Sequence, residues 1–162
     1  MSKSHLQPPP ALLDFLAPYN HDVQRLALAV RRFVQDHIPP MTEMIVDAPS
    51  ALSEGFTPSG RFKDAVCHLT VSPNHVCLGF NRGAELPDRG GHLIGAGKSV
   101  RHLIIDRVED LLAPHVRELL LEAVKLAHVK SARGGVIIKS GATRQRQPGL
   151  APLRPRAVAG VD

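Results

Sequence analysis

The glycine-rich run Gly95-Ala96-Gly97-Lys98-Ser99 has the residue types of a loop that holds phosphate. A nucleotide-binding phosphate loop needs another glycine, separated by four residues from its Gly-Lys pair, and that position is His92. Such a loop also opens a helix, whereas the residues after Ser99 have the pattern of a strand. The spacing therefore argues against a nucleotide-binding loop and indicates a turn that glycine permits.

A smaller anion site is compatible with the same turn. Backbone N–H groups at Gly97, the mobile charge of Lys98 and the planar fork of Arg101 are suited to a phosphate or a carboxylate. Strand alternation places Lys98 and His102 on one face and Arg101 on the other. The sequence therefore predicts that an anion is held by Lys98, His102 and backbone donors.

Two carboxylates, Glu85 and Asp88, flank Leu86-Pro87 in the preceding loop. Paired carboxylates can bind a cation or exchange protons. A solvated turn is the simpler interpretation. One of them can also pair with Arg101, which would make the loop structural rather than ligand-binding.

Four histidines lie in or beside the predicted sheet, at positions 68, 75, 92 and 102. Imidazole is a common metal ligand, but a metal site needs three or four converging ligands, and the sequence has no Cys-x-x-Cys or His-x-x-x-His pair. His68 and Asn81 fall on the mixed face of the sheet, where they join His102 and the loop residues as predicted ligand-binding residues. The competing interpretation is that the sheet histidines are partly buried with hydrogen-bonded partners. The metal, if any, is unknown.

The two cysteines, Cys67 and Cys77, have no metal-like spacing and fit a reducing cytosol. Apolar packing is the expected role of both, because a nucleophilic cysteine needs a base and an electropositive setting. No complete catalytic signature is present, so we expect a protein that is not an enzyme.

The elements that position these residues are read from periodicity. Lys63–Val71 and His75–Gly83 form a predicted hairpin around Ser72-Pro73-Asn74, with Cys67, Leu69 and Val71 on the apolar face, and residues 100–106 add a third strand. Thr42–Val46 and Ser50–Phe56 are predicted short strands.

Two long helices flank these strands. Residues 20–37 have an apolar stripe at helical spacing, with Asn20 as N-cap and Arg31 on the outer face. Residues 108–112 form a short helix, and Pro114 opens a second long helix that ends near His128. The order predicts an α+β fold, an antiparallel sheet of about five strands with the two long helices on one face.

Charge divides the chain. Residues 1–129 carry 13 Lys and Arg against 14 Asp and Glu, whereas residues 130–162 carry 7 against 1, so the basic balance belongs to the tail. We expect a lead at 1–18, a domain at 19–130 and a disordered basic Pro/Gly-rich tail at 131–162. Nucleic acid is an unlikely partner except weakly through the tail. No secretory signal or membrane span is expected, which predicts a cytoplasmic location.

Several runs carry a resemblance to a known family. They are Phe62–Thr70, Val76–Asp88 and Gly95–His102, of which the Gly-Lys-x-x-Arg run is the most recognisable. Over about Val23 to Leu126 the chain resembles the YdhG-like family of small bacterial proteins, largely a domain of unknown function. The resemblance implies a frataxin-like α+β sandwich, and one branch of the family is linked to intracellular iron delivery. Such proteins hold iron on an acidic ridge of the first helix and strand, but here the first helix also carries Arg25, Arg31 and Arg32.

The sequence thus predicts a ligand-binding or carrier module that is not an enzyme, acting on an unknown small molecule or anion. The alternatives are a frataxin-like iron chaperone, with iron implied by the resemblance only, and a protein–protein interaction module.

Overall fold

A computed structural model describes residues 7–129 and 134–140. The elements follow one another along the chain in this order: α1 Pro10–Leu16, α2 His21–His37, β1 Thr42–Asp47, β2 Leu52–Thr57, the 3-10 helix η1 Phe62–Asp64, β3 Cys67–Val71, β4 Val76–Phe80, the 3-10 helix η2 Gly83–Glu85, β5 Arg101–Ile105, the 3-10 helix η3 Val108–Leu112, α3 Pro114–Leu126 and β6 Gly135–Ser140. The fold is α+β, as predicted.

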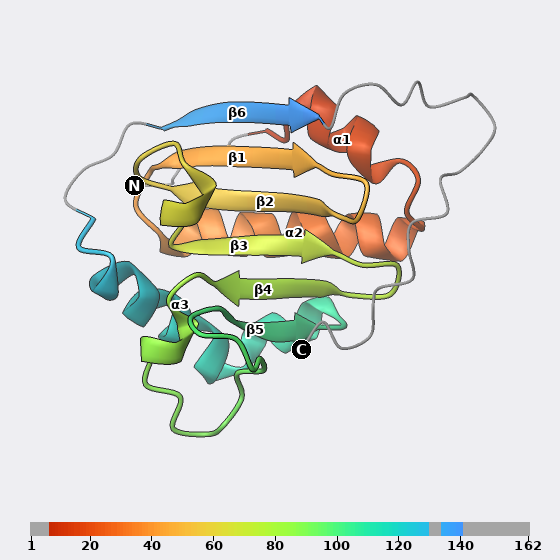
Figure 1. Cartoon of the computed structure of the whole chain (residues 1–162). Coiled ribbons are helices and arrows are strands. Elements are labelled where there is room, and N and C mark those ends of the chain that lie inside the picture. Colours follow the sequence, from red (N-terminus) through yellow and green to blue (C-terminus); the bar gives the residue numbers. More distant parts are fainter. Residues whose placement is uncertain (1–6, 130–133, 141–162) are drawn as a thin grey trace.

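The described strands form one mixed sheet in the order β5-β4-β3-β2-β1-β6. Strands β1 to β5 pair with one another antiparallel, and β6 adds a parallel edge strand along β1 (Figure 1). The prediction of about five antiparallel strands was therefore incomplete. Strand β6 lies inside the segment that was predicted as a disordered tail, and residues 141–162 of that segment lie outside the described residues.

Strand β6 was missed for a physical reason. All six of its residues are exposed, so no periodic buried face marks it in the sequence. Its place comes from backbone pairing with β1, in a register that sets Thr42 against Gly135 and Asp47 against Ser140. Backbone pairing of this kind leaves no signature in side-chain hydropathy.

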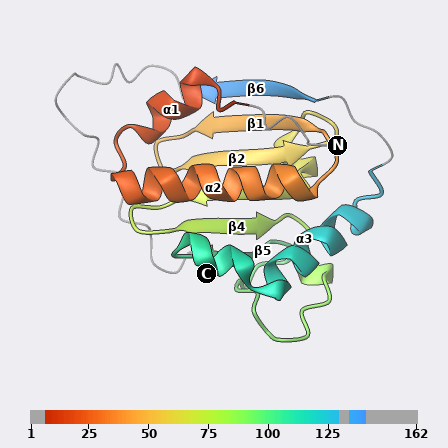
Figure 2. The same cartoon turned by 180° about the vertical axis from the view of Figure 1, so that it is seen from behind.

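Helices α2 and α3 lie on the same face of the sheet (Figure 2). The predicted stripe of α2 is buried at Val23, Leu26, Ala27, Val30 and Val34, and Asn20 caps the helix by accepting a hydrogen bond from the Val23 N–H at 2.9 Å. In α3 the buried residues are Val116, Leu119, Leu120 and Ala123. The sheet packs its own apolar face against these helices, and that face includes Cys67, Leu69 and Val71 as predicted. Helix α1 adds Leu12 and Leu16 to this core.

Arg31 corrects the prediction for α2. It was placed on the outer face of the helix, yet it is only 3% exposed and reaches the sheet. Two buried glutamates, Glu43 on β1 and Glu54 on β2, draw it inward. The helix thus carries a charged contact within an otherwise apolar stripe.

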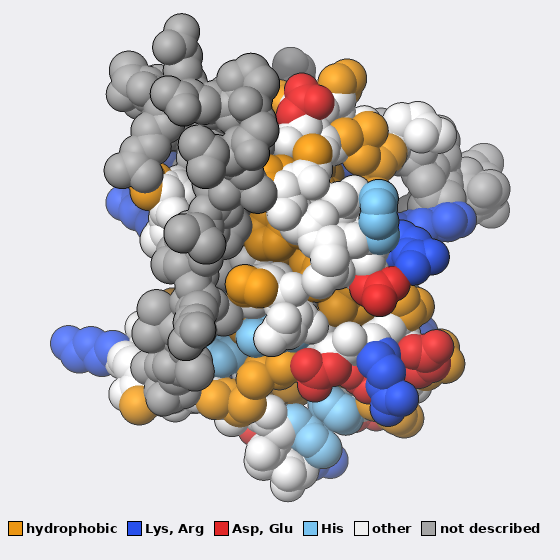
Figure 3. Space-filling view, turned by 90° about the vertical axis from the view of Figure 1, so that its right-hand side faces the viewer, with side chains coloured by type: hydrophobic (Ala, Val, Ile, Leu, Met, Phe, Trp, Pro, Cys, Tyr) orange, Lys and Arg blue, Asp and Glu red, His pale blue; other side chains and the backbone are white. Residues whose placement is uncertain are grey.

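The surface in Figure 3 mixes acidic, basic and apolar side chains, and no single sign of charge dominates the described residues seen from this side. None of the helices in the described part of the chain combines the length and the apolar character that crossing a membrane requires.

Candidate functional site

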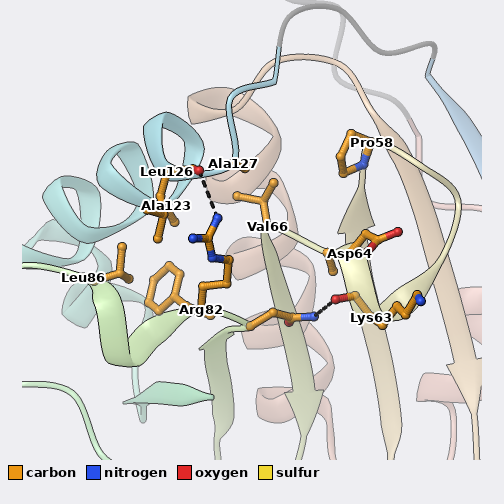
Figure 4. A pocket seen from close by; sticks show the side chains of 12 residues that line it. Pro58, Lys63, Asp64, Val66, Arg82, Leu86, Ala123, Leu126 and Ala127 are labelled. Carbon is orange, nitrogen blue, oxygen red and sulfur yellow. Dashed lines mark hydrogen bonds between the residues drawn. The ribbon is translucent and has the colours of Figure 1, made fainter. Parts of the chain in front are cut away.

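A pocket of about 250 Å³ opens where the C-terminal end of α3 faces the segment 58–66 and the end of β4 (Figure 4). Polar and apolar atoms contribute about equally to its surface, and the apolar lining residues are Pro58, Ala65, Val66, Phe80, Leu86, Ala123, Leu126 and Ala127. Four polar residues complete the lining: Lys63, Asp64, Asn81 and Arg82. The lining therefore suits a ligand that has both apolar and polar groups, and the chemistry of the site depends on which polar side chains are already engaged.

Arg82 forms one wall, and each of its three side-chain nitrogens donates a hydrogen bond. Its Nε donates to Glu85 at 2.6 Å, and a second nitrogen donates to the other carboxylate oxygen at 2.8 Å. Its remaining nitrogen donates to the Leu126 carbonyl at 3.2 Å, which ties the end of β4 to the end of α3 (Figure 4). The hydrogen bond from Arg82 lowers the pKa of Glu85. Because Arg82 caps a terminal carbonyl of α3, it counters the negative end of the helix beside the pocket.

Asp64 is also engaged, on the opposite wall. It accepts a hydrogen bond from the Ser59 hydroxyl at 2.7 Å and one from Arg61 Nε at 2.8 Å. The Ser59 hydrogen bond is the largest contribution that lowers the pKa of Asp64. Lys63 is different, since it is exposed and forms no ion pair with any residue that the structure describes. Its ammonium is exposed to solvent, and its charge adds to the lowering of the pKa of Asp64.

Asn81 connects this pocket to the opposite face of the sheet. Its amide nitrogen donates to the Phe62 carbonyl at 2.9 Å and to the Lys63 carbonyl at 3.3 Å, so it fixes the backbone that carries Lys63. Its oxygen lies 2.7 Å from His68 Nδ1. Because the amide oxygen only accepts, His68 Nδ1 carries the proton in this contact.

His68 and Phe62 cover two glycines on that face. A Cβ on Gly55 would lie 2.8 Å from the Phe62 ring, and a Cβ on Gly79 would overlap the His68 ring. The Phe62 and His68 ring centroids are 5.8 Å apart. Burial lowers the pKa of His68, the hydrogen bond that His68 donates to Asn81 opposes this effect, and the nearby His102 adds to the lowering. His68 and Asn81 are therefore brought together as the sequence predicted, in contacts that hold η1 against the sheet.

The other predicted site residues lie around β5. His102 shares a row across the sheet with Gly79 and His68, and its backbone bridges to Ile94 through two hydrogen bonds of 2.9 Å. Lys98 lies in the loop before β5, not in the strand, because β5 begins at Arg101. The shared strand face that was predicted for Lys98 and His102 is thus not formed.

Arg101 closes this loop on itself. It donates to the Gly97 carbonyl at 2.6 Å and to the Val100 carbonyl at 2.8 Å. The predicted alternative, pairing with Glu85 or Asp88, is wrong: Glu85 binds Arg82, and Asp88 accepts hydrogen bonds from the backbone N–H groups of His92 and Leu93. Arg101 therefore organises the turn, and Lys98 is left exposed with no ion pair in the described part of the chain.

Both cysteines are free thiols. Burial alone raises the pKa of Cys67 far above its usual range, and burial together with Asp106 raises the pKa of Cys77 to about 11. A thiol with such a pKa holds its proton at neutral pH and is a poor nucleophile. Among residues 7–129 and 134–140, no group of three or more His, Cys, Asp or Glu side chains is arranged to hold a metal ion.

A buried charged cluster lies away from the pocket, between α2 and the sheet. Arg31 Nε donates to both Glu43 oxygens, at 3.2 and 3.0 Å, and Gln35 donates to Glu43 at 3.1 Å. Glu54 is 0% exposed, lies 3.7 Å from Arg31 Nε, and its two oxygens accept no hydrogen bond from the described residues. Burial, followed by the charge of Glu43, raises the pKa of Glu54 to about 8.

Sequence reasoning found Asn81 but missed Lys63, Arg82 and the α3 residues as one site. Lys63 and the α3 residues are some sixty residues apart along the chain, and they come together only because α3 packs against the end of β4. Comparison with family models, with curated proteins and with solved structures found no match to this chain.

Proposed function

We propose that the protein is a non-enzymatic binding protein that holds a small carboxylate with an apolar body in the pocket at the end of α3. The observation that carries this proposal is a lining that combines apolar side chains such as Val66 and Leu126 with the exposed Lys63, for which no ion pair is found among the described residues. The apolar body lies against Val66 and Leu126, and the carboxylate meets the Lys63 ammonium. Pockets of this kind orient a ligand with few polar groups.

The size of the pocket limits the ligand. Pockets for drug-sized molecules have volumes of roughly 300–1,000 Å³, and this one measures about 250 Å³. A single ring or a short aliphatic chain fits that volume, whereas a nucleotide does not. Binding rather than catalysis is favoured because both thiols stay protonated at neutral pH and His68 is engaged with Asn81.

The test is an NMR titration of the ¹⁵N-labelled protein with benzoate, hexanoate and inorganic phosphate. We expect benzoate or hexanoate to shift the amides of Val66 and Ala127, and Lys63→Ala to abolish these shifts. Lys98→Ala is the matched control, because it removes an equally exposed lysine from the predicted loop site. Shifts confined to the Gly97 loop, abolished by Lys98→Ala and not by Lys63→Ala, would replace the pocket with the loop as the anion site. No shifts at millimolar ligand would refute binding at either place.

The resemblance to the YdhG-like family, the frataxin-like fold and the cytoplasmic location stay predictions. An iron-carrier role would need carboxylates that are free to bind metal, and on α2 Asp22 lies 2.5 Å from Arg25. That pairing makes the small-molecule proposal the stronger one. A role in protein–protein interaction also stays a prediction.

A further inference from the structure

Two histidine rings lie face to face where the loop between η2 and β5 meets the start of α3. The ring centroids of His92 and His115 are 3.7 Å apart, and the ring planes are 7° from parallel. His92 belongs to the loop, which extends beyond the sheet beside α3 (Figure 2), and His115 is the second residue of that helix. The stack therefore joins the loop to the helix.

Contacts within the loop hold the His92 side chain in place. The Asp88 carboxylate accepts hydrogen bonds from the backbone N–H groups of His92 at 2.9 Å and Leu93 at 2.8 Å. The His92 ring also covers Gly90, where a Cβ would overlap it. Leu93 is partly buried and packs against the core. The ring of His92 is thus fixed from its own side before it meets His115.

Charges of both signs surround the stack. The rings lie in the lining of a pocket of about 350 Å³, whose other charged groups come from the loop and the helix: Asp88, Arg89, Glu118 and Glu122. Glu122 pairs with Lys125 at 3.2 Å. The three carboxylates therefore exceed the two cations by a single charge, and the positive N-terminal end of α3 reduces that excess further. These surroundings compensate one proton on the two rings but not a second.

The stacked geometry has the same preference. A protonated ring is attracted to the face of a neutral one, whereas two protonated rings at this distance repel each other. Burial, followed by the charge of His92, lowers the pKa of His115 below the usual 6.5, against the carboxylates of Asp88 and Glu118. The stacked pair therefore takes up its second proton at a lower pH than two separated rings would. By linkage, the stack is fully favoured above about pH 6.5 and loses stability as the pH falls below that value.

We propose that the His92–His115 stack is a pH-dependent latch, which holds the loop on α3 at neutral pH and releases it in mild acid, when both rings carry a proton. Asp88 does not cause the release. Burial acts to raise its pKa, but the hydrogen bonds from Leu93 and His92 and the charges of both histidines lower it overall, so Asp88 stays ionised in mild acid. The loop begins directly after Leu86, which lines the ligand pocket, yet the latch needs no ligand and can be tested without one.

The test is ¹⁵N relaxation of the full-length protein at about pH 7.5 and about pH 5, on either side of the usual imidazole pKa. Backbone order parameters are about 0.85 in rigid segments and below about 0.6 in flexible ones. We expect the amides of residues 89–93 to pass from the rigid range at the higher pH to the flexible range at the lower pH. The amides of β3 should stay rigid at both. A wild-type loop that is equally ordered, or equally mobile, at both pH values overturns the proposal.

Variants of His115 separate the stack from its charge. His115→Phe keeps a ring that can stack on His92 but takes up no proton, so the loop should stay ordered at about pH 5. His115→Ala removes the ring, so the loop should be mobile at both pH values. His21→Phe is the matched control, because it removes an exposed histidine from α2 and should leave the acid release unchanged.

Three results with these variants would overturn the latch. They are an acid release in His115→Phe that equals that of the wild type, an ordered loop in His115→Ala, and loss of the release in His21→Phe. Circular dichroism of each variant establishes that it is folded. If His115→Ala does not fold, the wild type and His115→Phe decide the question, since the phenylalanine variant keeps the ring and removes only its titration.

Discussion

Replacing Glu54 with glutamine should make the protein more stable in alkaline solution and change its stability little in acid. The folded chain keeps the Glu54 proton up to about pH 8, whereas the ordinary pKa of this side chain is 4.5. Between these two values the folded state binds more protons than the unfolded state, so the free energy of unfolding falls as the pH rises. Below pH 4.5 both states are protonated and this loss is absent. Above about pH 8 both are ionised and the loss is complete.

The size of the loss follows from the difference between the two pKa values. At ~1.4 kcal/mol for each pKa unit, the rise from 4.5 to about 8 corresponds to at most about 5 kcal/mol. Domains of this kind are stable by about 5–15 kcal/mol in total, so a single side chain governs much of the alkaline stability. Glutamine keeps the shape of the protonated carboxyl and cannot ionise. We therefore expect Glu54→Gln to gain a few kcal/mol over the wild type at about pH 8.5.

The assay is urea denaturation at a series of pH values, followed by circular dichroism because the chain has no tryptophan. The control is Glu118→Gln, which alters an exposed glutamate on α3. Its curve should run parallel to that of the wild type. If the curve for Glu54→Gln also runs parallel to the wild type between about pH 5 and 8.5, then Glu54 ionises at its ordinary pKa and the reasoning about its burial is refuted.

Three further predictions concern the packing at Gly79, the contribution of β6 to stability and the binding of iron. Gly79→Ala should lower the melting temperature by several degrees, because the new Cβ overlaps the His68 ring, whereas Gly97→Ala should not, because nothing lies within 4 Å of a Cβ there. Truncation after Ser140 should change the melting temperature by less than a few degrees, since it leaves every described strand in place. Truncation before Gly135 should lower the melting temperature by more, since it removes β6 from β1, and equal melting temperatures would show that β6 contributes nothing. Calorimetric titration with ferrous iron should show no saturable binding at micromolar protein, since Arg25 neutralises Asp22 on α2, and stoichiometric binding would contradict this.

Local patterns predicted much of the fold. The hairpin followed from two apolar arms around a Pro-Asn turn, and the structure pairs Val71 with Val76 at its closed end. Helix α2 followed from its stripe and from the Asn20 cap. In each case the information lies within a few residues of the element, where side-chain periodicity and capping act.

What the sequence could not predict depends on distant partners. The helical pattern places Arg31 on the surface, because its partners Glu43 and Glu54 lie on two strands that follow later in the chain. The pocket needs the end of α3 beside the end of β4, a contact that Arg82 makes across to Leu126. Lys63 belongs to no motif, and the role proposed for it rests on its place in the pocket lining, which its spacing in the sequence does not indicate.

Strand β6 bears on how the chain behaves before it is complete. It is the last described element, and its partner β1 is the first strand. During synthesis β6 leaves the ribosome after the other described strands, so until then the outer backbone N–H and C=O groups of β1 have no partner in β6. An unpaired edge is a template for strands of other molecules. Strand β6 pairs that edge of β1 and itself becomes the edge of the sheet, so a chain that ends before Gly135 presents the edge of β1 instead.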